Sequence, residues 1–431
     1  MTQPLSKRTV AAFAAAVGPA AVLGLPFSIY LPPYVAAGGL VPVALVGLIF
    51  SLSTLWDGVV DPLIGTMIDR KSKGDAPHRR WMQLAALPLA LLLPLLVVWG
   101  DDLNFWVLLP LLLIFYSCYS LFDIAHLSWG AALAHDADDS ARLFGNREFA
   151  AKFILILAFA LPAIAQTLIP DIDLQGRILA YASMMLILFP IALFAIAQLP
   201  GRPVVHQAGI GWRQELRASL NCPPLLLLLL LQLMTSFSFG ALSSAFIFFA
   251  DGYLQLDARG ALLLFSTFVG GALFTPFWTW AARRFGKPQT MLIDCLWLIA
   301  AMLTALLLPT TNFVASFAFS LFLGGGFMGL IFLHGMIADL APHDRARCGR
   351  DRSAFLYAIV NLMQKFGNAI AVALSYAVLG AYGFDAAHPG ESAELVRNLF
   401  IGLPIAGWIA AFVVLLFLRR YPEVNRRGVV A

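Results

Sequence analysis

Long apolar runs recur along this chain at nearly even spacing, and they constrain its fold more than any other feature. A helix needs about 20 mainly apolar residues to cross the hydrocarbon core of a bilayer. Charged residues make up only 12% of the chain, whereas a typical soluble protein carries about 25%. A chain this apolar cannot hide its surface in one water-soluble core. We therefore expect an all-α integral membrane protein.

The apolar runs predict twelve transmembrane helices. They are expected at residues 9–37, 41–68, 81–100, 104–134, 147–169, 177–199, 222–250, 259–282, 289–308, 312–340, 354–381 and 396–418. Lipid offers the backbone no hydrogen-bond partners, so each span must satisfy its own peptide groups. Pro and Gly interrupt several runs, such as "GLPFSIYLPPY" in the first. We expect kinked, tilted helices at these places.

Lysine and arginine are distributed unevenly among the loops. All but four of the 28 Lys and Arg residues lie in tails and loops that would share one side of the membrane; the four are Arg177, Arg259, Lys365 and Arg397. Because positively charged loops stay in the cytoplasm, both termini are expected there, with the protein in a bacterial cytoplasmic (inner) membrane. Lys7 and Arg8 precede the first run without a clear cleavage site, so we expect a tail and not a removed signal peptide.

The polar loop at 200–221 divides the chain into two halves. Residues 1–199 and 222–431 each hold six expected spans, which predicts two six-helix bundles joined by a cytoplasmic loop. The fourth and tenth spans both run into a His-Asp pair, at 135–136 and 343–344. The two halves therefore repeat one another in the same orientation.

The turn after the second span of each half carries a further repeat. Setting Pro62 on Pro276 places Arg70 on Arg284, and both stretches end in a basic turn. The residues "GTMIDR", which end in Asp69 and Arg70, resemble the loop signature of the major facilitator superfamily. This resemblance implies the major facilitator fold, with twelve transmembrane helices in two pseudo-symmetric six-helix bundles and a substrate site between them. We expect Asp69, Arg70 and Arg284 to belong to a cytoplasmic gate.

Two carboxylates stand in the middle of the second span. Asp57 and Asp61 lie four residues apart and so share one helix face. The matching positions of the second half are Gly271 and Thr275, so the scaffold itself does not require acids there. Two nearby carboxylates in a low-dielectric setting cannot both stay ionised unless a cation or a proton joins them. The pair is therefore a candidate site for Na⁺, Li⁺ or H⁺; the alternative is that each acid pairs with a basic residue and fixes packing.

Other polar side chains within the spans extend this candidate site. Ser53 and Thr54 can complete a cation shell beside the acids. Asp123, in the fourth span, can join that shell or accept hydrogen bonds from substrate hydroxyls. Lys365, in the eleventh span, can bridge to the acids and couple the halves, or act as a simple counter-ion. Arg147 can reach Asp123 or the cation site, or form a salt bridge at a helix end.

Aromatic side chains and one histidine complete the list of candidates. His126 lies three residues after Asp123 and can contact substrate or be a hydrogen-bonded buried histidine. Trp129, Trp278 and Trp280 can stack on a sugar ring, although tryptophans are also common in helix packing. The predicted substrate contacts are Asp123, His126, Trp129, Lys365 and Arg147.

Four stretches of the chain resemble the glycoside–pentoside–hexuronide:cation symporter family (melibiose permease-like). They are "LWDGVVDPLIGTMIDR", "YSLFDIAHLSW", "GNREFA" and "DRSAFLYAIVNLMQKFGNAIA". The resemblance runs through the whole chain. It implies a cation site at Asp57 and Asp61, with a sugar-recognition role for Asp123 beside it. It also implies functional charges at Arg147 and Lys365.

The first span departs from that family in one respect. Sugar-transporting members typically carry an aspartate in helix one, and the aligned position here is Ala20. A hydroxyl bonded to a charged group is worth about 1.5–3 kcal/mol, so this loss weakens the case for a sugar. The expected function is cation-coupled symport of a small organic solute, by family default a sugar or glycoside, through alternating access. The alternative is a transporter of the same fold for a lipid-like or amphiphilic (lysolipid type) substrate, or an exporter.

Several other function classes are not expected. The basic residues lie in short loops between apolar runs, which gives no nucleic-acid signal. A membrane enzyme would need a nucleophile–base or metal constellation, and the nearest candidates are the repeated His-Asp pairs, which suit a gate or scaffold better. We expect no cofactor besides the coupling cation. The expected partners are a small-molecule substrate and membrane lipid, with the protein acting as a monomer.

Overall fold

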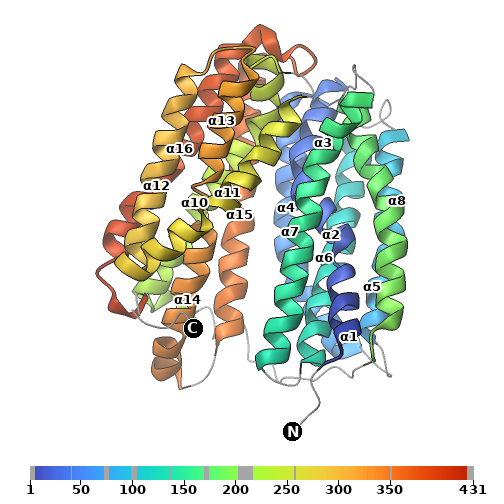
Figure 1. Cartoon of the computed structure of the whole chain (residues 1–431), viewed down its shortest axis with the longest axis vertical. Coiled ribbons are helices and arrows are strands. Elements are labelled where there is room, and N and C mark those ends of the chain that lie inside the picture. The colour runs from blue at the N-terminus through green and yellow to red at the C-terminus, as the bar shows by residue number, and fades with distance from the viewer. Residues whose placement is uncertain are drawn as a thin grey trace. The chain divides into compact units, whose positions relative to one another are not determined.

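The computed structural model describes residues 5–39, 41–71, 77–98, 104–134, 137–168, 174–201, 217–256, 259–327, 329–349 and 352–424. Every regular element within these ranges is a helix (Figure 1), which confirms the all-α prediction. The chain forms two compact units, residues 1–208 and 209–431. The division falls inside the predicted loop at 200–221. Each unit is described by itself.

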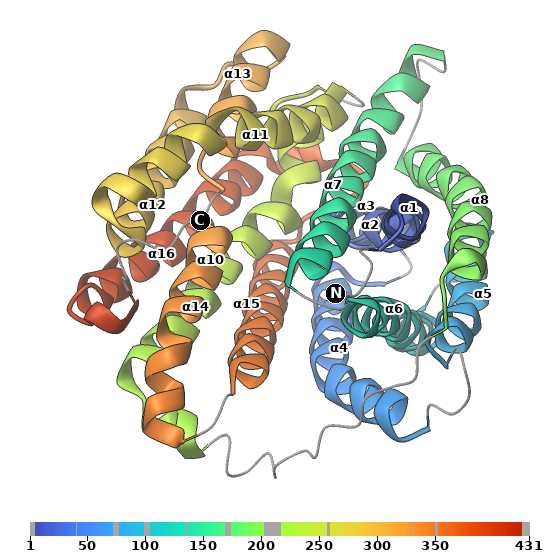
Figure 2. The ribbon, with the colours of Figure 1, turned by 60° about the horizontal axis from the view of Figure 1, so that its bottom comes forward.

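Within the described residues, unit 1 contains eight helices. They are α1 (Lys7–Ala15), α2 (Gly18–Leu23), α3 (Leu25–Ala37), α4 (Val43–Lys71), α5 (Pro77–Val98), α6 (Phe105–Leu133), α7 (Ala137–Leu168) and α8 (Leu174–Gln198). Within this unit α6 packs against α4 and α5, while α1 and α2 pack against α7 and α8 (Figure 2). The helix pair α4 and α6 brings together the second and fourth predicted spans, which carry the three candidate acids.

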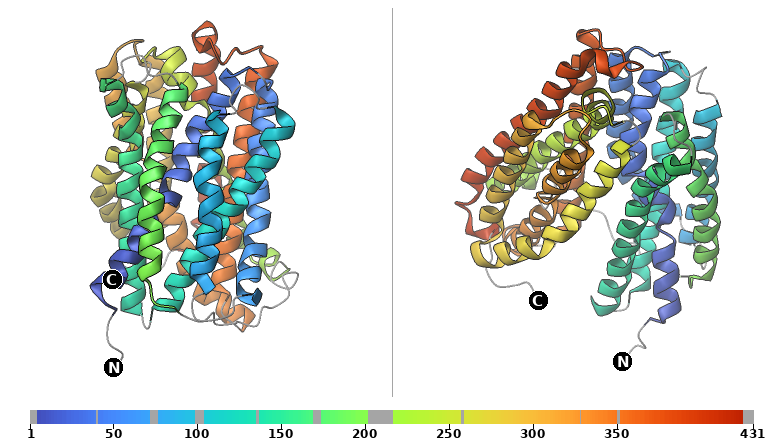
Figure 3. Two further views of the ribbon diagram at one scale, coloured as in Figure 1. Left: turned by 90° about the vertical axis from the view of Figure 1, so that its right-hand side faces the viewer. Right: turned by 45° about the horizontal axis from the view of Figure 1, so that its top comes forward.

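Within the described residues, unit 2 contains seven long α-helices, a short helical stretch at 217–220 and short turns of other helix types. They are α10 (Pro223–Phe248) with the π-helical turn η2 (Phe249–Tyr253), α11 (Gly260–Phe285), α12 (Lys287–Thr304), α13 (Phe313–Gly324), α14 (Gly329–Cys348), α15 (Ser353–Ala381) and α16 (Ala393–Leu418). In this unit α10 packs against α15 and α16, and α12 runs beside α16 (Figure 3). A Cβ on Gly240 of α10 would lie 3.0 Å from the Cα of Asn368 on α15. A small residue there permits the close backbone approach typical of membrane helices.

Many of these helices have the length and apolarity of membrane spans. Within the described ranges, nine helical stretches are long and apolar enough to cross a membrane. Large apolar side chains such as Leu87, Phe194 and Leu307 are more than half exposed. Surface of this kind fits contact with lipid and not with water.

The first predicted span is broken into three helices. The α-helix is interrupted after Ala15 and again at Gly24, which has φ −74° and ψ −104°. Pro19 lies at the start of α2, where its missing N–H costs nothing. A Cβ on Gly24 would lie 3.3 Å from the Tyr119 hydroxyl of α6, so glycine leaves room for that hydroxyl at the break. The Pro and Gly residues therefore do interrupt this span, as predicted.

The tenth predicted span is also broken, between α13 and α14. The break follows a glycine run at 324–326, and two indole N–H groups satisfy carbonyls freed there. Trp278 Nε1 donates to the Gly325 carbonyl at 2.5 Å, and Trp297 Nε1 donates to the Phe322 carbonyl at 2.8 Å. A break at membrane depth needs such partners because water is not available.

Replacing Trp278 with Phe should destabilise unit 2. The change leaves the Gly325 carbonyl without its indole donor, and an unsatisfied buried acceptor costs about 1–3 kcal/mol. We expect a lower thermal midpoint for the purified protein in detergent. The matched control is Trp280→Phe, because the Trp280 side chain is 55% exposed. Equal shifts in the two variants would show that the hydrogen bond does not stabilise the break.

The loop between α15 and α16 carries an exposed ion pair. His388 Nδ1 lies 2.9 Å from Asp385 Oδ2, and the backbone N–H of Ala387 donates to Asp385 Oδ1 at 2.9 Å. The hydrogen bond with Asp385 raises the pKa of His388 above its ordinary value of 6.5. The same bond lowers the pKa of Asp385 below 3.8.

The titration of His388 should depend on its ion pair with Asp385. A histidine whose pKa is raised by folding adds stability below pH 6.5, and this contribution is lost as the pH rises through the raised pKa. We expect the imidazole NMR midpoint to lie above 6.5 and to return toward that value in Asp385→Asn. The exposed Glu391→Gln change serves as the control and should leave most of the shift. An unchanged midpoint in Asp385→Asn would contradict the assignment.

Candidate functional site

Asp57 and Asp61 lie one turn apart on the continuous helix α4, as the sequence predicts. The Asp57 side chain is buried, at 6% exposure, while Asp61 is partly exposed. The Ser120 hydroxyl of α6 donates a hydrogen bond to Asp57 Oδ1. This donor is neutral, so the hydrogen bond from Ser120 does not by itself cancel the charge of an ionised carboxylate.

The hydroxyls of Ser53 and Thr54 line α4 just before Asp57. Ser53 Oγ donates to the Ile49 carbonyl at 2.8 Å, and Thr54 Oγ1 donates to the Phe50 carbonyl at 2.9 Å. Each hydroxyl therefore donates its proton to a carbonyl of its own helix. Its oxygen keeps lone pairs that can accept a hydrogen bond from another group. Oxygens of this kind are suitable ligands for a hard cation.

Tyr116 of α6 connects α4 to the first span. Its side chain lies near Ser28 of α3 and Thr54 of α4, and it lies within electrostatic range of Asp57. Tyr119, one turn further along α6, places its hydroxyl at the Gly24 break. The two tyrosines thus link the acidic site to the broken part of the first span.

Arg147 of α7 forms an ion pair with Asp123 of α6 through Nη2 and Oδ1. Its Nη1 lies 2.9 Å from Glu148 Oε1. The Arg147 and Asp123 side chains are 10% and 26% exposed, and Asp61 lies within electrostatic range of Asp123. The predicted approach of Arg147 to Asp123 is confirmed. The functional roles of both residues stay predictions.

His126 and Trp129 are fully buried within unit 1. His126 Nε2 lies 2.9 Å from the Phe13 carbonyl, and its ring packs 4.3 Å from the Phe13 ring. Trp129 Nε1 donates to the Pro200 carbonyl at 3.1 Å. Neither side chain offers surface to a substrate in this structure. The geometry therefore supports the packing alternative for both, and the same holds for the buried Trp278.

Lys365 lies on α15 and is partly buried within unit 2. Because the acids belong to unit 1, its predicted bridge to them stays a prediction. Two further carboxylates of unit 2 were not singled out from the sequence, Asp294 and Asp339, and both are buried. Asp339 pairs with Lys287 Nζ at 2.7 Å. The signal available in the sequence was an acid inside an apolar run, the same signal that identified Asp57.

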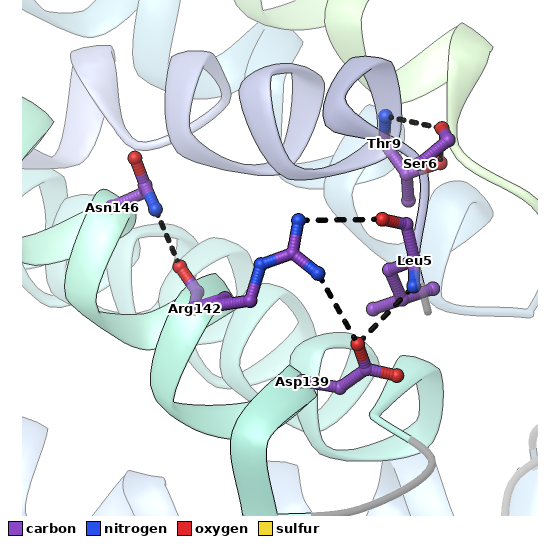
Figure 4. Close-up of polar contacts among 6 residues, drawn as sticks. All are labelled: Leu5, Ser6, Thr9, Asp139, Arg142 and Asn146. Atoms are coloured by element: carbon purple, nitrogen blue, oxygen red, sulfur yellow. Dashed lines mark hydrogen bonds and ion pairs between the residues drawn. The ribbon is translucent and has the colours of Figure 1, made fainter. Parts of the chain in front are cut away.

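The predicted gate residues are only partly described. The side chains of Asp69 and Arg70 and the pair at 135–136 lie outside the described part of the structure, and Arg284 is exposed at the end of α11. At the start of α7, the backbone N–H of Leu5 donates to Asp139 Oδ1 at 3.2 Å, and Arg142 lies 3.8 Å from Asp139 (Figure 4). Arg142 Nη2 also donates to the Leu5 carbonyl at 3.5 Å.

Unit 2 repeats this arrangement with an Asp and an Arg at the same spacing. Arg347 Nη2 lies 3.5 Å from Asp344 Oδ1, and the same guanidinium donates to the carbonyls of Ala218 and Asn221 just before α10. In each unit, therefore, an arginine donates to at least one backbone carbonyl of the segment just before a helix, which is α1 in unit 1 and α10 in unit 2. Asp344 belongs to the second of the repeated His-Asp pairs, and the first pair, at 135–136, lies outside the described residues.

The candidate cation site lacks the ligands of a transition-metal centre. Among the described residues, no group of three or more His, Cys, Asp and Glu side chains is placed to hold a metal ion. An ion at Asp57 and Asp61 would instead use carboxylate, hydroxyl and carbonyl oxygens. Such oxygens suit alkali cations, and the carboxylates alone suit a proton.

Comparison with known families decides the class of the protein. The profile of the family described as MFS/sugar transport protein matches residues 12–423. The chain belongs to this family. This MFS protein is therefore an integral membrane transporter and not an enzyme, and the expectations of the major facilitator fold and of an MFS symporter family are confirmed.

Individual relatives of this MFS transporter are distant. It is similar to the uncharacterized symporter YjmB of Bacillus subtilis (strain 168), with 22% identity over 422 residues that cover 93% of this chain and 90% of the relative. Among solved structures, the nucleoside transporter NupG matches with a TM-score of 0.71 and 13% identity, covering 96% of this chain and 100% of that chain. A variant of the E. coli fucose:proton symporter FucP matches with a TM-score of 0.54 and 15% identity, covering 95% and 98%.

A third structural relative is a bacterial homologue of the human lysosomal transporter Spinster, solved in an inward-facing and unoccupied conformation. It matches with a TM-score of 0.59 and 16% identity, covering 98% of this chain and 99% of that chain. At these identities the three structures support the fold of this MFS transporter. They do not indicate its substrate, which has to be argued from the site.

Proposed function

We propose that this transporter couples the uptake of a small polar organic solute to a cation bound at Asp57 and Asp61. The observation that carries the proposal is the polar cluster of unit 1. A buried carboxylate, Asp57, accepts from the Ser120 hydroxyl and lies one turn from Asp61, inside a helix whose other residues are mostly apolar. Ionisable groups inside membrane spans are costly and usually serve function.

The residues that would hold the cation come from α4 and α6. Asp57 and Asp61 supply charge, while Ser53, Thr54 and Ser120 supply neutral oxygen atoms. A bound Na⁺, Li⁺ or proton would offset the repulsion between the carboxylates. Asp123 stands close enough to Asp61 to sense this change, and Arg147 already balances its charge.

The substrate side of the site is proposed to lie beside Asp123 and Arg147. The ion pair presents both a hydrogen-bond acceptor and a donor, which suits hydroxyl groups of a sugar or glycoside. The family description and the fucose:proton symporter among the structural relatives agree with such a solute. Cation and solute would each strengthen binding of the other, typically by about 1–3 kcal/mol. Lys365 is proposed to take part in this coupling.

We further propose that the two units provide alternating access to the site. In this proposal the protein is a monomer, and both of its termini lie in the cytoplasm of a bacterium. The uneven distribution of Lys and Arg supports this orientation. The Asp–Arg contacts at Asp139 and Asp344 lie at helix ends, near the start of α7 and the end of α14.

A second candidate is transport of a lipid-like or amphiphilic solute. It is favoured by the first span, where Ala20 is buried and no charge occurs between Arg8 and Asp57. The match to the Spinster homologue is compatible with it. A purely apolar first span offers fewer partners to sugar hydroxyls and more to an acyl chain.

Uptake into proteoliposomes tests both candidates. Labelled monosaccharides, glycosides and a lysolipid are offered with an inward gradient of Na⁺, Li⁺ or H⁺, or with none. The proposal expects one gradient to accelerate uptake of a sugar or glycoside. Acceleration of lysolipid uptake alone would favour the second candidate. If a solute is taken up and none of the three gradients changes the rate of its uptake, cation coupling is overturned.

A further inference from the structure

Two neighbouring arginines at the start of α5 (Pro77–Val98) have different surroundings. Arg79 Nη2 donates to the Leu199 carbonyl, at the end of α8, at 2.6 Å. The Arg80 side chain is exposed and has no hydrogen-bond or ion-pair partner among the residues that the structure describes. Gln83, one turn further along α5, is exposed as well. Arg79 therefore serves the packing of unit 1, whereas Arg80 is free to bind a group outside the protein.

The charge of Arg80 has no internal counterpart in the described part of unit 1. A positive charge in the first turn of a helix opposes the helix dipole, so Arg80 does not favour the formation of α5. In unit 2 the helix after the equivalent turn is α12, and its first residue, Lys287, pairs with Asp339 at 2.7 Å. No carboxylate of the described residues does the same for Arg80. An anion from outside the protein would balance this charge.

The face of α5 that follows Arg80 is apolar and exposed. Leu84, Leu87 and Leu91 follow it at intervals of four, three and four residues, which places all four side chains on one helix face. The three leucines are 62%, 66% and 59% exposed. Because this chain is an integral membrane protein, leucines this exposed are expected to contact lipid. Arg80 thus stands at the end of a lipid-facing leucine stripe.

The length of this stripe matches the depth of one bilayer leaflet. Eleven residues separate Arg80 from Leu91, and a rise of about 1.5 Å per residue gives a distance of about 16 Å. The hydrocarbon of one leaflet is about 15 Å thick, half of the bilayer core. A lipid whose acyl chain lies along the leucines therefore brings its phosphate to the level of Arg80. A guanidinium group and a phosphate can form two parallel charge-assisted hydrogen bonds.

We propose that Arg80 and the leucine stripe (Leu84, Leu87 and Leu91) form a binding site for an anionic phospholipid. Arg80 binds the phosphate, the Gln83 amide donates to other headgroup oxygens, and the leucines contact an acyl chain. A zwitterionic headgroup suits the site less well, because its own amine already offsets the charge of its phosphate. The inference depends on the membrane position of α5 and not on the solute or the coupling cation.

The proposed orientation of the protein agrees with an anionic lipid at this place. Arg80 belongs to the basic turn after the second span, which the distribution of Lys and Arg places in the cytoplasm. Anionic lipids give the cytoplasmic leaflet a negative surface potential, and basic residues close to the membrane are attracted to it. Arg80 would then meet such headgroups at the leaflet where they act on it.

Native mass spectrometry of the full-length, delipidated protein tests the site. The protein is titrated with phosphatidylglycerol or with phosphatidylcholine, and we expect the wild type to bind phosphatidylglycerol more tightly. Arg80→Gln should weaken the binding of phosphatidylglycerol about fivefold and leave that of phosphatidylcholine unchanged. Arg80→Lys keeps the charge but loses the paired hydrogen bonds, so its affinity should lie between the other two. Inorganic phosphate at the lipid concentration should displace little phosphatidylglycerol, because it cannot contact the leucines.

The matched control is Arg259→Gln, which removes an equal charge from unit 2. Arg259 is exposed at the start of α11, but Leu263 and Leu264, which follow it, are buried. It therefore lacks a lipid-facing stripe, and this variant should keep the wild-type affinity for phosphatidylglycerol. The thermal midpoint of each variant in a neutral detergent shows that the fold is intact.

A photoreactive phosphatidylglycerol locates the bound lipid in the wild-type protein, independently of any variant. With the reactive group on an acyl chain, we expect crosslinks to the stretch 84–91 of α5, and competition by unlabelled phosphatidylglycerol. Crosslinks that avoid α5, or equal affinity of the wild type for the two lipids, would contradict the proposal. Equal losses in Arg80→Gln and Arg259→Gln would show that net charge alone attracts the lipid. Displacement by inorganic phosphate at equal concentration would assign Arg80 to a free anion and reject the lipid site.

Discussion

Uptake by Asp57→Asn and Asp61→Asn is expected to lose its dependence on the cation gradient. Each change keeps the size of the side chain and removes one of the two negative charges that would hold the ion. Interactions with a charged group are worth about 1.5–3 kcal/mol, so cation affinity should fall by a factor of about 10 to 100. The measurement is gradient-driven uptake in proteoliposomes, together with a cation titration of thermal stability.

The second half of the chain offers a matched control for this experiment. Thr275 occupies the repeat position of Asp61, and Thr275→Val changes a polar side chain at the equivalent place in unit 2. This variant should keep the cation dependence of the wild type. If both aspartate variants retain near-wild-type coupling, the acids are packing residues and the proposed site is wrong.

Most of the fold could be predicted because membrane spans leave a strong compositional signal. The predicted spans at 41–68 and 104–134 correspond closely to α4 (Val43–Lys71) and α6 (Phe105–Leu133). The predicted start of the fifth span at residue 147 was wrong, since α7 begins at Ala137. The first turns of α7 contain many polar residues, so a search for apolar runs does not detect this part of the helix. Helix formation depends on backbone bonding and not on apolarity alone.

Breaks within spans were predictable where the sequence carries strong cues. Pro and Gly residues indicated interruption of the first span, and its helices break at Gly24. The tenth span depends on contacts distant in the sequence, because Trp278 and Trp297 supply the donors that stabilise its break. No local pattern predicts which carbonyl a distant indole will reach.

The sequence indicated the acids of the candidate site and two of its hydroxyls, Ser53 and Thr54. Carboxylates in an apolar helix are costly and therefore conspicuous, so Asp57, Asp61 and Asp123 could be found from the sequence. Hydroxyl groups are common in membrane helices because they can donate to their own backbone. Ser120 and Tyr116 were missed for this reason. Their one available signal is a spacing of three and seven residues before Asp123, which places them near its helix face.

Arg147→Gln should destabilise the protein and also abolish coupled uptake. The change leaves Asp123, which is 26% exposed, without its ion-pair partner. Breaking a buried pair by removing one member costs about 3–5 kcal/mol, and partial exposure of Asp123 places the expected loss near the lower end of that range. Thermal unfolding in detergent measures the stability, and gradient-driven uptake measures the function.

The double variant Asp123→Asn with Arg147→Gln separates the two effects. It removes both charges, so the cost of an uncompensated carboxylate disappears and stability should recover to within about 1 kcal/mol of the wild type. Uptake should stay lost, because the solute has lost both its charged acceptor and its charged donor. A control pair from unit 2, Lys287→Gln with Asp339→Asn, neutralises an ion pair outside the proposed site and should retain uptake. Recovery of uptake together with stability in the Asp123 and Arg147 double variant would assign that pair to the scaffold and leave solute recognition to other residues.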